Sequence, residues 1–306
     1  VSSTITFDGN VANMPSGTVT YNGGAFCVDG GNLILKGNNV ESDSMNPDKE
    51  EIGGVEVNVK NIIIKNNKAS SGGGIYIKDS EKSELSNCKM IGNVGTWGGG
   101  VCFDGSGSLT LKDCNLTDNS RSGVCIHGSG EPTLENCNII GNRGNWGGGV
   151  CIGDRSNASS GNPTVKNCNI IGNKGRNGCG VYIYSSGTNT FTSCDISGNE
   201  VYDGGDNAFL GGGVCITGTG GTNTFTGCSI SNNKSSAEGG GFYIDKGTTT
   251  LENCDIIGNT SSSSRRNWGG GIYTFGGAIT LTNCNLKGNS AHIGGGALFE
   301  QGSQTF

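Results

Sequence analysis

The sequence is poor in charged residues, proline and histidine, and it contains no long apolar segment. Charged residues make up 15% of the 306 residues, and there are 4 prolines and 2 histidines. The low charge argues against disorder driven by charge repulsion. No apolar run approaches the ~20 residues that a membrane-spanning helix needs. The net charge is −6 and basic residues cluster nowhere beyond Arg265 and Arg266, so neither nucleic acid nor a membrane surface is an expected partner.

Glycine is abundant instead, at 59 residues, where ~7% is usual. The glycines follow no three-residue period, so a collagen helix is excluded. Many glycines and asparagines around a modest apolar content indicate many tight corners and a thin core. The chain begins with Val1 and shows no signal peptide, so we expect a processed or excised segment.

A repeated motif dominates the sequence. Residues 111–119 read Leu-Lys-Asp-Cys-Asn-Leu-Thr-Asp-Asn, and a glycine-rich stretch that leads into a short apolar segment, such as 98–103, accompanies each copy. The spacing between copies ranges from 23 to 34 residues, which suits stacked solenoid coils. Similar copies occupy 134–142, 165–173, 191–199, 225–233, 251–259 and 281–289.

The parity of the apolar residues predicts where the chain bends. Val101 and Phe103 are two apart and share one face of a strand, whereas Leu111 and Cys114 are three apart and share a face only across a corner. Three such strands and corners make one coil. We therefore predict an all-β, single-stranded, right-handed parallel β-helix of about eleven three-strand coils, as one continuous domain over 1–306. The expected insertion loops are 39–52, 153–163, 200–210 and 260–268.

The last asparagine of each copy is predicted to form a corner ladder in which side-chain amides bond along the axis. The eleven predicted rungs are Asn10, Asn38, Asn67, Asn93, Asn119, Asn142, Asn173, Asn199, Asn233, Asn259 and Asn289.

A buried cysteine column is the second predicted ladder, and it should continue toward the N-terminus through Ile62, Leu33 and Ile5. Stacked thiols ~4.8 Å apart exceed the ~3.5–4.5 Å that disulfide Cβ atoms need. We therefore expect small buried hydrophobes, with some axial disulfides as the alternative. A closed core gives a soft metal no access path, so no cofactor or metal is expected there. The column comprises Cys88, Cys114, Cys137, Cys168, Cys194, Cys228, Cys254 and Cys284.

A third row is predicted to face outward, starting with Cys27 and Glu56. Thiol and aromatic groups on a surface often mark contacts, so this row is a candidate packing seam for a neighbouring chain or a long loop. The alternative is plain strand preference under partial cover by the insertions. The candidate seam comprises Tyr76, Cys102, Cys125, Cys151, Tyr182, Cys215, Tyr243 and Tyr273.

Other side chains suggest binding more than catalysis. Trp97, Trp146 and Trp268 each precede Gly-Gly-Gly at one corner, where they could stack on sugar rings or shield the corner from water. No cluster of carboxylates that would suit a glycosidase is visible, and His127 and His292 are far apart in sequence. We therefore expect no catalytic residues.

The loop that carries Asp43, Asp48, Glu50 and Glu51 is a weak candidate for Ca²⁺. A solvated acidic loop is the simpler interpretation of these four carboxylates.

The repeats resemble those of chlamydial-type polymorphic outer-membrane proteins, which carry FxxN and GGA(I/L/V) motifs. Residues 7–10 read Phe-Asp-Gly-Asn and 295–298 read Gly-Gly-Ala-Leu, although most copies have Ile or Leu in place of Phe and no autotransporter barrel follows. The resemblance implies a surface-exposed passenger region with an adhesive role.

We expect a non-enzymatic extracellular or cell-surface protein of a structural or adhesive kind. It would be either a fibre subunit that stacks head to tail or a surface passenger segment, because the repeat phase runs through both ends without a capping helix. Its partners would be further copies, other surface proteins or glycans. The alternative is a β-helix that binds or cleaves polysaccharide.

Overall fold

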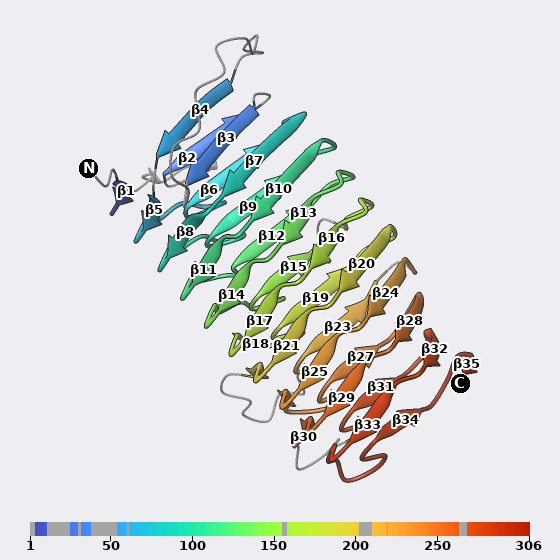
Figure 1. Ribbon diagram of the computed structural model, residues 1–306. Helices are drawn as coiled ribbons and strands as arrows, with labels where there is room; N and C mark the ends of the chain where they lie inside the picture. Colours follow the sequence, from blue (N-terminus) through green and yellow to red (C-terminus); the bar gives the residue numbers. More distant parts are fainter. Residues whose placement is uncertain are drawn as a thin grey trace.

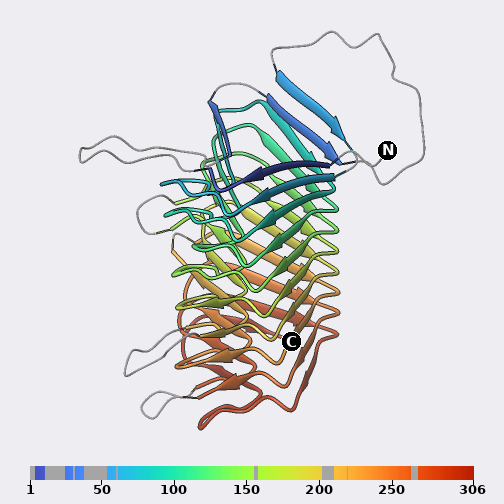
Figure 2. The same cartoon turned by 90° about the vertical axis from the view of Figure 1, so that its left-hand side faces the viewer.

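The fold consists of strands and turns stacked along one axis. The computed structural model describes residues 4–10, 25–29, 32–37, 54–59, 61–154, 158–201, 210–218, 220–262 and 268–306. Within these ranges no α-helix occurs, and hence no helix long and apolar enough to cross a membrane. Figures 1 and 2 show one continuous column of coils, which confirms the predicted parallel β-helix with three strands per coil.

From residue 61 onward, each coil contributes one strand to each of three long parallel sheets. Sheet I follows the glycine run and contains β2 (Phe26–Asp29), β6 (Ile75–Lys78), β9 (Val101–Asp104), β12 (Val124–His127), β15 (Val150–Ile152), β19 (Val181–Tyr184), β23 (Val214–Thr217), β27 (Phe242–Ile244), β31 (Ile272–Thr274) and β34 (Ala297–Phe299). Sheet II contains β4 (Gly54–Val59), β3 (Asn32–Gly37), β7 (Lys82–Ser86), β10 (Ser108–Lys112), β13 (Thr133–Glu135), β16 (Thr164–Lys166), β20 (Thr188–Thr192), β24 (Thr222–Thr226), β28 (Thr248–Glu252), β32 (Ala278–Thr282) and β35 (Gln304–Thr305).

Sheet III precedes the asparagine corner, and a small sheet IV follows it. Sheet III contains β1 (Thr4–Asp8), β5 (Asn61–Lys65), β8 (Cys88–Ile91), β11 (Asn115–Thr117), β14 (Asn138–Ile140), β17 (Asn169–Ile171), β21 (Asp195–Ser197), β25 (Ser229–Ser231), β29 (Asp255–Ile257) and β33 (Asn285–Lys287). Sheet IV contains β18 (Lys174–Gly175), β22 (Glu200–Val201), β26 (Lys234–Ser235) and β30 (Thr260–Ser261).

The corner before each cysteine depends on a left-handed backbone. Asp113, Asn136 and Asn167 have φ values of 53°, 53° and 52°, a region that Asn, Asp and Gly tolerate best. The bend brings Leu111 and Cys114 onto the same inner face, and both are 0% exposed. The odd spacing of apolar residues in the sequence therefore locates this corner.

The asparagine side chains occupy the next corner and bond from coil to coil. Asn119 donates from its backbone N–H and from Nδ2 to Oδ1 of Asn142, at 2.9 and 3.0 Å, and Nδ2 also donates to the Met90 carbonyl at 2.9 Å. The amide–amide bond recurs from Asn67 onward. Each buried amide thereby satisfies backbone groups at the same corner of the preceding coil.

The N-terminal coils depart from the predicted register. Asn10 bonds directly to Asn67 at 2.9 Å, and β1 pairs directly with β5, so Asn38, which lies outside the described residues, was wrongly placed between them. Leu33 belongs to sheet II, where its N–H donates to Ser83 Oγ at 3.0 Å, and not to the cysteine column.

The predicted outward row also needs correction at this end. Cys27 pairs directly with Tyr76 in sheet I, whereas Glu56 lies in β4 opposite Ile34. The apolar run 33–35 in β3 and the alternating residues of β4 fit any of the three sheets, so composition alone could not choose between them. Within the described residues, sheets I and III each stack ten strands and sheet II stacks eleven, so the column makes about nine turns where about eleven coils were expected. The predicted insertions lie wholly or partly outside the described residues.

The ladder should dominate the stability of the column. Replacement Asn142→Ala removes the acceptor of the Asn119 N–H and of Asn119 Nδ2, and it removes the side-chain donor to the Leu116 carbonyl and to Asn173 Oδ1. Since each orphaned buried polar group costs roughly 1–3 kcal/mol, we expect the free energy of unfolding to fall by about 3 kcal/mol or more in urea titrations followed by circular dichroism. Asn138→Ala, which removes a more exposed amide from the same coil, should change it by less than about 1 kcal/mol. Equal losses in the two variants would contradict this.

Candidate functional site

A second layer of chain covers the outer face of sheet I. Residues just before the glycine run lie on that face, where the Trp97 ring contacts His127 and the Trp146 ring contacts Tyr182. At Gly98, where φ is +51°, an added Cβ would lie 2.9 Å from Cβ of Cys125 and 3.0 Å from Cβ of Cys102. Glycine is thus required because the covering layer lies directly on the outward side chains.

The outward row of sheet I is therefore buried beneath the chain itself. It forms a second core in which Cys102 and Cys125 are 1% exposed and Cys215 is 0% exposed, together with Tyr76, Cys151 and Tyr182. Tyr273 is also buried and Tyr243 is half-buried. Of the two occupants expected for this packing seam, a neighbouring chain or a long loop, the structure shows residues of the same chain, such as Trp146 and Leu210, packed on the row.

The connection between the ladder asparagine and the glycine that precedes the sheet I strand is short in the coil that leads into β12. Ser120, Arg121 and Ser122 separate Asn119 from Gly123, whereas the coil before has six residues between Asn93 and Gly100. The short connection forces Arg121 and Ser122 into positive φ, at 78° and 101°, and it supplies no tryptophan. A corner cleft of about 130 Å³ results, lined by Thr96, Trp97, Arg121, Ser122, Cys125, Asn145, Trp146 and Cys151.

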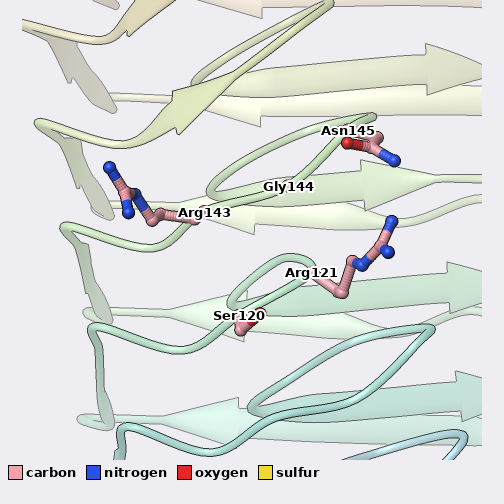
Figure 3. A pocket seen from close by; sticks show the side chains of 5 residues that line it. All are labelled: Ser120, Arg121, Arg143, Gly144 and Asn145. Carbon is pink, nitrogen blue, oxygen red and sulfur yellow. The ribbon is translucent and has the colours of Figure 1, made fainter. Parts of the chain in front are cut away.

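A wider hollow adjoins this corner cleft, since Arg121 and Asn145 line both. It measures about 320 Å³ and is completed by Ser120, Arg143 and Gly144. Figure 3 shows Arg121 and Asn145 extending toward one side of it and Arg143 toward the other. Because they share these two residues, the cleft and the hollow together form one recess.

At the floor of the corner cleft lies a cluster of thiol, imidazole and carboxylate groups. Cys125 and His127 are two apart on β12 and share its outward face, with Cys125 Sγ 3.5 Å from His127 Nε2. Asp154, one coil onward, places Oδ2 3.2 Å from the same Nε2, and the His127 and Asp154 side chains are 5% and 3% exposed. Trp97 contacts the edge of the imidazole, with ring centroids 5.6 Å apart.

The neighbouring thiols shift the pKa values in this cluster. Hydrogen bonds from Cys102 and Cys151 hold the pKa of Cys125 well below its usual value, against the effect of burial and with help from His127. The shared hydrogen bond with Cys125, together with burial, raises the pKa of Cys102 and of Cys151. Burial alone would lower the pKa of His127, but the negative charge on Cys125 and the bond to Asp154 raise it to about 10. The cluster therefore favours a thiolate–imidazolium pair.

The interior cysteine column is chemically different. From Cys88 to Cys254 its thiols are at most 2% exposed, and Cys284 is half-buried at the C-terminal end. Cys114 Sγ donates to the Leu85 carbonyl at 3.2 Å, and burial is the main cause that raises its pKa. The thirteen cysteines whose side chains are described are all free thiols, so the axial disulfides offered as an alternative do not form among them.

The structure brings together some of the candidates from the sequence and separates others. Trp97 and Trp146 flank the corner cleft, whereas Trp268 packs on Tyr273 much farther along the axis, with centroids 6.0 Å apart. Sequence reasoning did not find the site that joins Arg121, His127 and Asp154. The sequence signal for this site was the spacing of 23 residues between Asn119 and Asn142, which is the shortest spacing between repeat copies. The proposed Ca²⁺ ligands Asp43, Asp48, Glu50 and Glu51 lie outside the described residues.

A comparison with models of protein families shows which family this chain belongs to. The model described as right handed beta helix region matches residues 2–162 and 156–306. The chain belongs to the right-handed β-helix family. Searches of curated proteins and of solved structures gave no match. Membership of this family fixes the architecture and does not specify an activity.

The reactivity of the thiols should differ sharply between the two rows of this β-helix protein. Cys125 lines the cleft and favours the thiolate, whereas Cys114 is enclosed and protonated. Because the thiolate is the nucleophile, iodoacetamide should modify Cys125 in the native protein at least about tenfold faster than Cys114, as measured by peptide mass spectrometry. His127→Ala should slow the modification of Cys125. Equal rates at Cys125 and Cys114 would refute this assignment.

Proposed function

We propose that this β-helix protein is a non-enzymatic, extracellular surface solenoid that adheres to acidic polysaccharide through the corner cleft and its adjoining hollow. The observation that carries the proposal is the placement of two tryptophans beside a group of exposed cationic side chains on one rigid corner. The arrangement suits a polymer that presents both sugar faces and carboxylate or sulfate groups.

The cationic group spans three successive coils in a protein whose net charge is −6. Arg121, Arg143, Lys174 and Arg176 are all exposed. Arg143 bridges Ser120 on one side and Lys174 on the other, so the backbones of Arg143 and Lys174 stand one strand spacing, ~4.8 Å, apart along the axis. A polymer that lies along the axis can therefore contact several of them, and arginine binds carboxylate or sulfate oxygens in a bidentate manner.

The two tryptophans supply an apolar surface next to these charges. Trp97 is 37% exposed, and Trp146 is half-buried against Tyr182 with ring centroids 5.0 Å apart. An indole held on one face by its neighbours loses little conformational freedom on binding. Aromatic side chains with one exposed face suit stacking on sugar rings.

The residues that line the recess support binding more than cleavage. None of them is Asp or Glu, whereas the usual glycosidase mechanism needs two carboxyl groups on opposite sides of the bond. The nearby carboxylate of Asp154 is 3% exposed and engaged with His127. A lyase or glycosidase activity is therefore the weaker alternative.

The adhesive role draws on the resemblance to the polymorphic outer-membrane protein repeats, which implies a surface passenger. The parallel strands of the described coils also give the rigid, elongated shape that such a role requires. Head-to-tail assembly into fibres remains a separate prediction. Electron microscopy of the purified protein tests it, and short monodisperse rods at all concentrations would remove it.

Removal of the arginines should weaken binding to acidic glycan. We expect Arg121→Ala/Arg143→Ala to weaken binding to uronate or sulfated oligosaccharides at least about tenfold in calorimetry, since each charge-assisted hydrogen bond contributes ~1.5–3 kcal/mol. Lys89→Ala/Lys112→Ala removes the same charge from exposed positions on sheets III and II and should leave binding unchanged.

Two results would overturn the proposal. One is a native protein that binds no acidic glycan on an array. The other is equal weakening by both double variants, which would indicate a general charge effect without a defined site. Cleavage of the polymer during the assay would instead favour the enzymatic alternative.

A further inference from the structure

We propose that Cys102, Cys125 and His127, with Asp154 as a fourth ligand, form a binding site for Zn²⁺ or a similarly thiophilic cation. The site lies under the corner cleft, and the proposal does not depend on the recognition of glycan. It rests on the separations of the donor atoms, on their convergence at one point and on the path that leads to them.

The donor atoms are close enough for one ion. The Sγ atoms of Cys102 and Cys125 and a ring nitrogen of His127 all lie within 4.8 Å of one another. Ligands on a tetrahedral zinc ion at ~2.3 Å for sulfur and ~2.0–2.1 Å for nitrogen stand roughly 3.5–3.8 Å apart. Contraction by about 1 Å, within the reach of side-chain rotation, completes the site.

The strand register holds these donors in place. Cys102 pairs with Cys125 between β9 and β12, and His127 follows Cys125 on the same face of β12. The backbone therefore fixes three ligand positions on two adjacent rungs before any ion binds. Such preorganisation on regular strands is what a geometrically demanding site requires.

Two acceptors converge on one atom of this cluster. Cys125 Sγ at 3.5 Å and Asp154 Oδ2 at 3.2 Å both approach His127 Nε2. One proton on Nε2 cannot point at both of them with good geometry. A cation located among the three atoms would accept all of them as ligands, and a Cys₂His set completed by a carboxylate matches the preference of zinc.

The cluster also has the access path that the interior column lacks. The corner cleft reaches the Cys125 side chain, whereas Cys114 and Cys137 are 0% exposed within the closed core. Binding displaces the proton of the Cys102 thiol and the proton shared by Cys125 and His127, so two protons pass to solvent for each Zn²⁺ bound. The chain offers a matched control in Cys215, which occupies the same row between Tyr182 and Tyr243.

Cobalt(II) is the probe for the test because it occupies zinc sites and its bonds to thiolates absorb light. The metal-free, reduced full-length chain is titrated with Co²⁺ and then with Zn²⁺. We expect thiolate-to-cobalt charge-transfer bands that saturate at one equivalent and disappear on addition of Zn²⁺. Cys125→Ala and His127→Ala should each raise the dissociation constant at least about 100-fold, as loss of a ligand should cost at least as much as loss of its supporting partner.

The controls separate a defined site from general thiol binding. Cys215→Ala should keep the full cobalt spectrum, as should Arg121→Ala/Arg143→Ala, which removes the proposed glycan contacts. Circular dichroism and thermal melts establish that each variant is folded, and His127→Gln replaces His127→Ala if the latter unfolds. Absence of the bands in the native chain, their persistence in Cys125→Ala, or their loss in Cys215→Ala would overturn the proposal.

Discussion

The stacking of each coil on the next at one strand spacing is the constraint on which the other features depend. The ladder of buried asparagine amides enforces it at the corner that follows sheet III, because each amide bonds to the backbone and side chain of a neighbouring coil. Given that spacing, every position in the repeat becomes a row along the axis. Interior thiols, covered thiols and exposed cations are then three consequences of one register.

Much of the fold could be predicted from spacing alone. The odd separation of Leu111 and Cys114 requires a corner, and Asp113 adopts the left-handed backbone there. The N-terminal register could not be obtained in the same way, because the consecutive apolar residues of β3 satisfy any sheet equally well. The register there is decided by pairing partners such as Ser83, which the pattern of apolar residues does not specify.

The corner cleft could not be predicted from the repeat pattern of the sequence, for a related reason. The coils are aligned by the residues that they share, whereas the connection Ser120–Ser122 differs from that of the preceding coil because it is shorter and has no tryptophan. The outward direction of Cys125 was correctly inferred, yet its burial depends on glycines such as Gly98 that let a neighbouring segment lie on it. The contact between His127 and Asp154 joins two coils across a gap in that cover, and three-dimensional packing alone reveals it.

The amide ladder also gives the molecule a polarity. From Asn10 to Asn259 every Nδ2 donates to the Oδ1 of the ladder residue one coil further toward the C-terminus, so the bond dipoles add along the axis and reinforce one another. Another solenoid could extend this row of amides only if its own amides pointed the same way. In the opposite orientation two donors, or two acceptors, would face each other across the junction.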